Sequence, residues 1–172
     1  VKAAAASNNA LTRLHSLWVL QRLGALEADR LAQAAKASEP ILRIHSQRIL
    51  KDRQKLASDE MSLARAGLKD SDPFVRKAAA EALGRHVEAG NLRPLLDLLA
   101  STDRADSHLT HVVRMALRDQ LRPADTWNSV AATKWSESDR RELADVSLGV
   151  PSLEAARYLV QNLGGAGAKL TE

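Results

Sequence analysis

The stretch Asp70-Ser-Asp-Pro-Phe-Val-Arg-Lys-Ala-Ala-Ala-Glu-Ala-Leu-Gly84 predicts the start and the buried face of one helix. Asp72 is placed to accept hydrogen bonds from first-turn amides, and Pro73 fits the first turn, where no amide donor is needed. Apolar residues then recur at helical spacing, at Val75, Ala78, Ala79, Ala82 and Leu83. We therefore expect a capped helix with one face in a core, and Asp72 and Pro73 as structural residues.

Segments elsewhere in the chain align with this helix without gaps and indicate a repeat. The four aligned segments cover residues 11–20, 41–50, 74–83 and 108–117, and each ends in Leu. Further helices are expected before the later three, at 27–37, 58–69 and 91–100. Beyond the repeat, helices are expected at 123–132, 137–147 and 152–163, with the glycines after 163 ending the last one.

The expected fold is all-α. The chain of 172 residues holds 30 Ala and 27 Leu but only 19 Val, Ile and Thr together, a balance that favours helix over strand. Each helix pair cannot bury its apolar stripe alone, so neighbouring pairs are expected to stack. We predict an α-α superhelix (solenoid) that forms one domain over 1–172. Its four to five pairs cover roughly 1–24, 27–53, 58–87, 91–121 and 123–163.

Composition excludes several functions. The absence of cysteine rules out disulfides, thiolate metal sites and a cysteine nucleophile. No apolar run is long enough to span a bilayer, so no membrane insertion is expected. A net charge of +4 with interspersed acids permits nucleic-acid binding without arguing for it. Because the first residue is Val, we expect a piece of a longer chain.

The quoted stretch resembles a HEAT repeat, whose second helix often begins with Asp-Pro followed by Val-Arg. HEAT-like repeats of the phycobilin-lyase type are similar at the same residues. A narrower resemblance, carried by 13–26 and 143–159, is to the HEAT segment of planctomycete-type membrane-bound-dehydrogenase-like proteins. In those proteins the repeats lie between a β-propeller and a haem c domain. This sequence has no Cys-x-x-Cys-His and no strand-rich portion, so neither redox module is expected within it.

The resemblance implies a non-catalytic scaffold whose partner is a protein or neighbouring domains of the parent chain. No enzyme, cofactor or metal is expected in these residues. The dehydrogenase-like resemblance implies a periplasmic or extracytoplasmic location; otherwise the cytoplasm is expected. Two alternatives remain: a nucleic-acid-binding HEAT-like stack of the DNA glycosylase type, which is disfavoured, and a HEAT-like bilin lyase.

An arginine recurs at the third position of three aligned segments, as Arg13, Arg43 and Arg76, and threonine replaces it in the fourth. One interpretation is a basic stripe for phosphates. We favour a structural ladder, in which each arginine pairs with an acid near the next helix pair. The acids placed for this role are Glu39, Asp70 and Asp72.

The first segment carries apolar residues where we expect its siblings to face water. Positions four, seven and eight of the third segment are Lys77, Ala80 and Glu81, whereas those of the first are Leu14, Leu17 and Trp18; Ile44 repeats the anomaly in the second. We interpret Leu14, Leu17, Trp18 and Ile44 as a candidate interaction surface. The alternative is an ordinary repeat cap, covered by residues 1–6 or by a preceding helix.

The remaining histidines and tryptophans have structural interpretations. His15 and His45 share one repeat position, which is expected to be buried and hydrogen-bonded to a neighbouring helix. His108 and His111 have metal-ligand spacing, but no glutamate follows as in a metalloprotease helix. Trp127 and Trp135 are expected to fill the core between the last helix pairs rather than to stack on a ligand.

Overall fold

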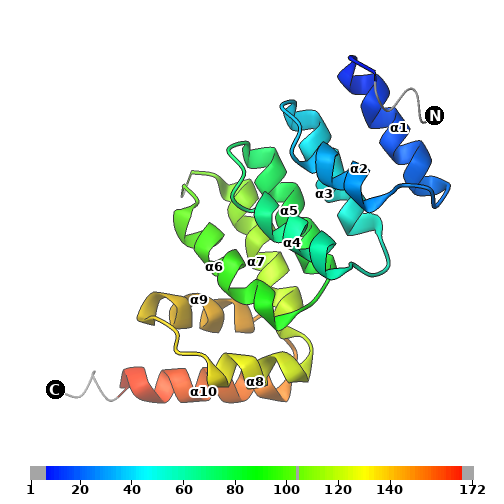
Figure 1. Ribbon diagram of the computed structural model, residues 1–172. Coiled ribbons are helices and arrows are strands. Elements are labelled where there is room, and N and C mark those ends of the chain that lie inside the picture. The colour runs from blue at the N-terminus through cyan, green and yellow to red at the C-terminus, as the bar shows by residue number, and fades with distance from the viewer. Residues whose placement is uncertain (1–6, 104, 168–172) are drawn as a thin grey trace. The chain divides into compact units, whose positions relative to one another are not determined.

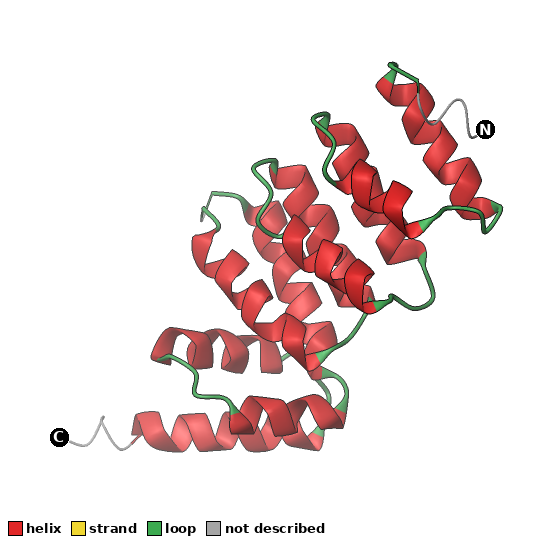
Figure 2. Ribbon diagram, viewed as in Figure 1, coloured by secondary structure: helices red, strands yellow, loops and turns green. Residues whose placement is uncertain are grey.

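The computed structural model describes residues 7–103 and 105–167 of the chain. Every regular element in these ranges is helical, with ten α-helices and one short 3₁₀ helix (Figure 2). The all-α prediction is therefore confirmed for the described part of the chain. The contacts of the described residues fall into two compact units, divided between His86 and Val87.

The amino-terminal unit consists of five helices (Figure 1): α1 Ala10–Arg22, α2 Ala28–Ala35, α3 Pro40–Asp52, α4 Ser58–Gly67 and α5 Pro73–Arg85. Helix α3 is its centre, because it contacts the other four helices. The predicted second helices of successive pairs contact one another in order, α1 with α3 and α3 with α5. Leu31, Ile49, Leu50 and Leu83 are fully buried between them.

The carboxy-terminal unit also has five α-helices: α6 Leu92–Ser101, α7 Ser107–Leu121, α8 Ala124–Ala132, α9 Glu137–Ser147 and α10 Leu153–Gly167. The 3₁₀ helix Ala89–Asn91 precedes α6. Helix α7 contacts α6, α8 and α9, and α9 contacts α10. The core of this unit is built from Leu95, Val113, Leu117, Leu121 and Leu143.

Two helix starts follow the capping chemistry expected from the sequence. The carboxylate of Asp72 accepts the amides of Phe74 at 2.8 Å and Val75 at 3.2 Å, and Pro73 is the first residue of α5. Ser136 and Asp139 form a reciprocal capping box at the start of α9. Both caps satisfy amides that have no partner inside the helix.

Other helix ends differ from the expectation. Ser58 is the first residue of α4 rather than its cap, and Asp106, not Ser107, accepts the Leu109 amide that caps α7. Helix α10 continues to Gly167 instead of ending at residue 163. A glycine costs only about 1 kcal/mol within a helix, so the glycine pair does not force an end.

Candidate functional site

Two members of the predicted arginine ladder pair with acids that precede the next helix. Arg13 of α1 pairs with Glu39, which lies directly before α3. Arg43 of α3 donates from Nε and Nη2 to the two oxygens of Asp70, at 2.7 and 2.9 Å, just before α5. The ladder prediction is confirmed for these two arginines. Asp72 belongs to the cap of α5.

The third arginine fixes a loop. Arg76 donates from Nη1 to the carbonyl oxygens of Asp70 and Ser71, at 2.9 and 3.0 Å. Arg43 donates from Nη1 to the carbonyls of Ala37 and Ser38 at the same two distances. Both arginines therefore hold the carbonyls five and six residues before them, which ties the loop within a helix pair to the second helix.

Asp70 joins these contacts. Its Oδ1 also accepts the amide of Asp72 at 2.9 Å, which shapes the turn before α5. The hydrogen bonds from Arg43, together with the Asp72 amide, hold the pKa of the Asp70 carboxyl below its usual range, against the opposing effect of burial. Asp70 therefore remains ionised while it links α3 to the loop before α5.

The prediction of an apolar interaction surface on the first segment is wrong for two of its residues. Leu14 is only 6% exposed and Leu17 only 3% exposed, so neither offers a surface to a partner. The seventh position is buried in the next two segments as well, at Gln47 and Ala80. The physical reason is that α3 packs beside both α1 and α5, which buries a side of each helix that the periodicity alone assigned to solvent.

Trp18 and Ile44 are half-buried. The indole N–H of Trp18 donates to Nδ1 of His45 at 2.9 Å, and the two rings meet edge to face. His45 thus makes the interhelical hydrogen bond that was expected of it, whereas His15 is exposed rather than buried. Trp18 therefore joins α1 to α3 of its own unit.

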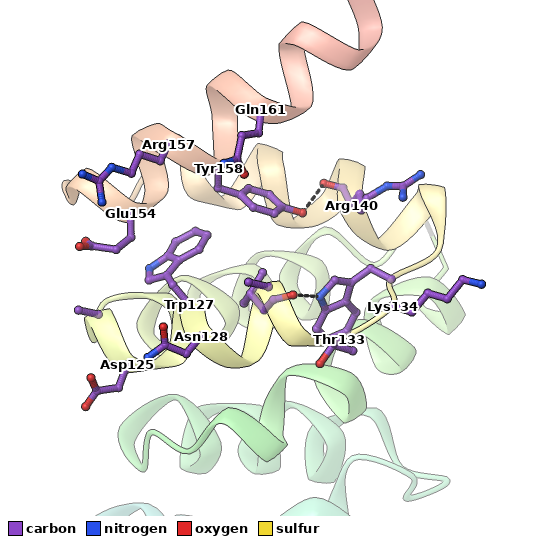
Figure 3. A pocket seen from close by; sticks show the side chains of 14 residues that line it. Asp125, Trp127, Asn128, Thr133, Lys134, Arg140, Glu154, Arg157, Tyr158 and Gln161 are labelled. Carbon is purple, nitrogen blue, oxygen red and sulfur yellow. Dashed lines mark hydrogen bonds between the residues drawn. The ribbon is translucent and has the colours of Figure 1, made fainter.

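A groove of about 640 Å³ lies within the carboxy-terminal unit, between α8 on one side and α9 and α10 on the other (Figure 3). Its volume is in the range of small-molecule pockets. Side chains from all three helices and from the loop before α9 form its walls. The groove is therefore the candidate functional site of the described residues.

Aromatic side chains form the interior of the groove. The rings of Trp127 and Tyr158 lie 5.4 Å apart between centroids, and Trp135 lines the wall beside them. The indole N–H groups donate away from the space, from Trp127 to the Leu121 carbonyl and from Trp135 to the Val130 carbonyl, each at 2.8 Å. With its indole N–H satisfied, the half-buried Trp135 offers apolar ring surface to an occupant, whereas Trp127 is only 8% exposed and lies mainly in the core.

The hydroxyl of Tyr158 is a polar group within this mainly aromatic interior. Its hydroxyl donates to the Arg140 carbonyl oxygen over a long 3.5 Å contact (Figure 3). Burial raises the pKa of the hydroxyl above its ordinary value. The hydroxyl therefore stays protonated at neutral pH and is available as a hydrogen-bond donor or acceptor, not as a base.

Charged side chains lie at both ends of the groove (Figure 3). Asp125 and Glu154 lie toward one end, with Arg157 beside them, and Lys134 and Arg140 lie toward the other. In the described part of the chain these five side chains make no hydrogen bond or ion pair with a protein group. The ends of the groove thus carry opposite net charge and unengaged polar groups.

One wall of the groove is held by Arg93 of α6. Its guanidinium lies over the Trp135 ring, 4.8 Å from the centroid, and donates to both oxygens of Asp139 at 3.2 and 2.7 Å. These hydrogen bonds raise the pKa of Arg93 and lower that of Asp139, so both remain charged. The loop carrying Trp135 is therefore anchored to α6 and to the cap of α9.

The groove was not predicted from the sequence. Trp127 and Trp135 were expected in the core; Trp127 is indeed only 8% exposed, but both residues line the groove. His108 and His111 are exposed, and no cluster of three potential metal ligands occurs among the described residues. Across the same residues, no helix combines the length and apolarity needed to span a membrane.

Comparison with models of known protein families finds no family that matches the chain. Comparison with curated protein sequences likewise finds no significant match.

Proposed function

We propose that the chain is a non-catalytic, HEAT-like helical-repeat module, an α-α superhelix that binds a protein partner or a neighbouring domain. Support for the repeat comes from the amino-terminal unit, where Arg13–Glu39 and Arg43–Asp70 are separated by 26 and 27 residues. One contact recurring at nearly constant spacing is expected of duplicated helix pairs.

The observation that carries the binding role is the groove between α8, α9 and α10. It combines apolar ring surface from the half-buried Trp135 and Tyr158 with charged side chains at its ends that have no described protein partner. This combination of an apolar interior and a few polar groups is typical of recognition sites. The protonated Tyr158 hydroxyl favours hydrogen bonding over acid–base chemistry there.

The arginine contacts favour a protein partner over nucleic acid. Nucleic-acid binding depends on lysine and arginine side chains that are free to contact the phosphate groups of the nucleic acid. Arg13, Arg43 and Arg76 are instead engaged by carboxylates and by loop carbonyls.

On the sequence resemblance alone, we also propose that the chain is the middle segment of a multidomain dehydrogenase-like protein. The flanking sequence of the full-length protein tests this, through the presence or absence of a Cys-x-x-Cys-His motif.

A displayed library of random peptides, selected on the purified chain, tests protein binding. We expect enrichment of related sequences whose synthetic versions bind in solution. Fluorescence anisotropy with labelled DNA and RNA is the parallel measurement, and weak binding that disappears with added salt is expected. Tight nucleic-acid binding, or a selection without any convergent peptide, would contradict the proposed function.

A further inference from the structure

The groove has the length of a short helical segment. Helix α8, which forms one wall, has nine residues and therefore extends for about 14 Å. Three apolar side chains at positions i, i+4 and i+7 of a helix span about 10 Å along its axis. Such a row fits along the wall, and the half-buried Trp135 and Tyr158 rings offer apolar surface to it.

The charges along the groove are ordered. One end carries the carboxylates of Asp125 and Glu154 against the single guanidinium of Arg157, and the other carries the two cations Lys134 and Arg140 (Figure 3). An α-helix has a positive amino end and a negative carboxyl end, each equivalent to about half a charge. The groove therefore complements a helix whose amino end lies toward Asp125 and Glu154.

We propose that this groove binds an amphipathic helix of a partner protein, with its apolar face on Trp135 and Tyr158 and its carboxyl end toward Lys134 and Arg140. The proposal rests on the protein-binding function and adds the form and the direction of the partner. A partner with basic residues in its first turn and acidic residues in its last turn fits best, because its side chains and its dipole then act together.

Two stapled synthetic helices of identical composition test the proposal. Both carry leucines at i, i+4 and i+7; one has lysines in the first turn and glutamates in the last, and the other has these charges exchanged. We expect the first to bind severalfold more tightly by calorimetry. Equal affinity of the two peptides, or no binding of either, would overturn the proposal.

Charge-reversal variants locate the site. Arg140→Glu should weaken binding of the first peptide about fivefold, as expected for loss and reversal of a rim charge. The neighbouring Arg141→Glu is the matched control, because Arg141 is exposed on the same helix, does not line the groove and pairs only with Glu137 among the described residues. Its affinity should stay within about twofold of the parent. Circular dichroism verifies that both variants fold.

A combined variant tests the direction of the helix. Asp125→Lys together with Arg140→Glu should reverse the preference between the two peptides. An unchanged preference, or self-association of the chain that the peptide does not displace, would refute the proposed occupant. Library peptides that bind equally well to the parent and to Arg140→Glu would leave the protein-binding function standing and overturn only the groove assignment.

Discussion

Arg43 of α3 donates two hydrogen bonds to the carboxylate of Asp70, and each side chain is only 14% exposed. Exposed ion pairs contribute little to protein stability, whereas breaking a buried ion pair is strongly destabilising; this partly buried pair is intermediate between the two classes. It joins the second helix of one pair to the turn that starts the next. The unit's helices are thus connected by a directional contact as well as by apolar packing.

Arg43→Gln is expected to lower the free energy of unfolding by about 2 kcal/mol, because it leaves Asp70 without its charged partner. Arg76→Gln is the matched control: it loses the same kind of loop-carbonyl contacts, but Arg76 forms no ion pair with a carboxylate among the described residues. Urea denaturation measures both. Equal losses for the two variants would show that the carbonyl contacts, not Asp70, account for the effect.

Asp72→Ala should cost about 1 kcal/mol, the usual value of an N-cap, because the Phe74 and Val75 amides lose their acceptor. Asp72→Asn should retain most of the stability, since its side-chain oxygen accepts the same hydrogen bonds. Thermal denaturation followed by circular dichroism compares them. Identical melting of the alanine variant and the parent would contradict the role of the cap.

The Trp18–His45 contact should make the amino-terminal unit less stable in mild acid. Burial, with additional effects of Arg48 and His15, lowers the pKa of His45, and the Trp18 hydrogen bond requires an unprotonated Nδ1. Between the folded and unfolded pKa values the unfolded chain binds more protons. The free energy of unfolding is therefore at its full value above about pH 6.5 and falls as the pH drops through the folded pKa.

Urea denaturation near neutral pH and near pH 5, with Trp fluorescence as the signal, tests this dependence. His45→Gln should reduce the pH dependence. His15→Gln, a change at the equivalent but exposed position of the first aligned segment, should leave most of it. A pH dependence that survives unchanged in His45→Gln would exclude His45 as its source.

Gly67→Ala should destabilise the amino-terminal unit by about 1–3 kcal/mol, despite the better helix propensity of alanine. A Cβ at Gly67 would lie 2.8 Å from the Cβ of Ala79 and would also strike the Gln47 side chain. Gly149→Ala is the control, because its nearest neighbours would be 3.5 Å away. Comparable stability of the two variants would show that α4 can shift outward without cost.

The sequence predicted those features that depend on local chemistry or on exact recurrence. Asp72 and Pro73 start a helix through neighbouring amides, so no tertiary information was needed. The partners of Arg13 and Arg43 could be found because arginine and acid both recur at nearly constant spacing. The burial of Leu17 was missed because it depends on the sideways contact between α1 and α3.

The groove could not be predicted in the same way. Trp127, Arg140 and Tyr158 come from three helices whose sequences do not follow the earlier repeat, so no alignment gave their register. The aromatic residues were visible, but the direction of an indole N–H depends on which carbonyl it meets. Only the folded arrangement places these rings around a shared space.

The ion pairs that join α1 to α3 and α3 to α5 also have a consequence for the folding rate of the amino-terminal unit. Arg13–Glu39 and Arg43–Asp70 close loops of 26 and 27 residues, and both therefore have a similar, modest entropic cost of closure. A unit whose tertiary contacts have such short sequence separation has a low contact order, which correlates with rapid folding. We expect this unit to refold on the microsecond-to-millisecond timescale, with either end able to start the process.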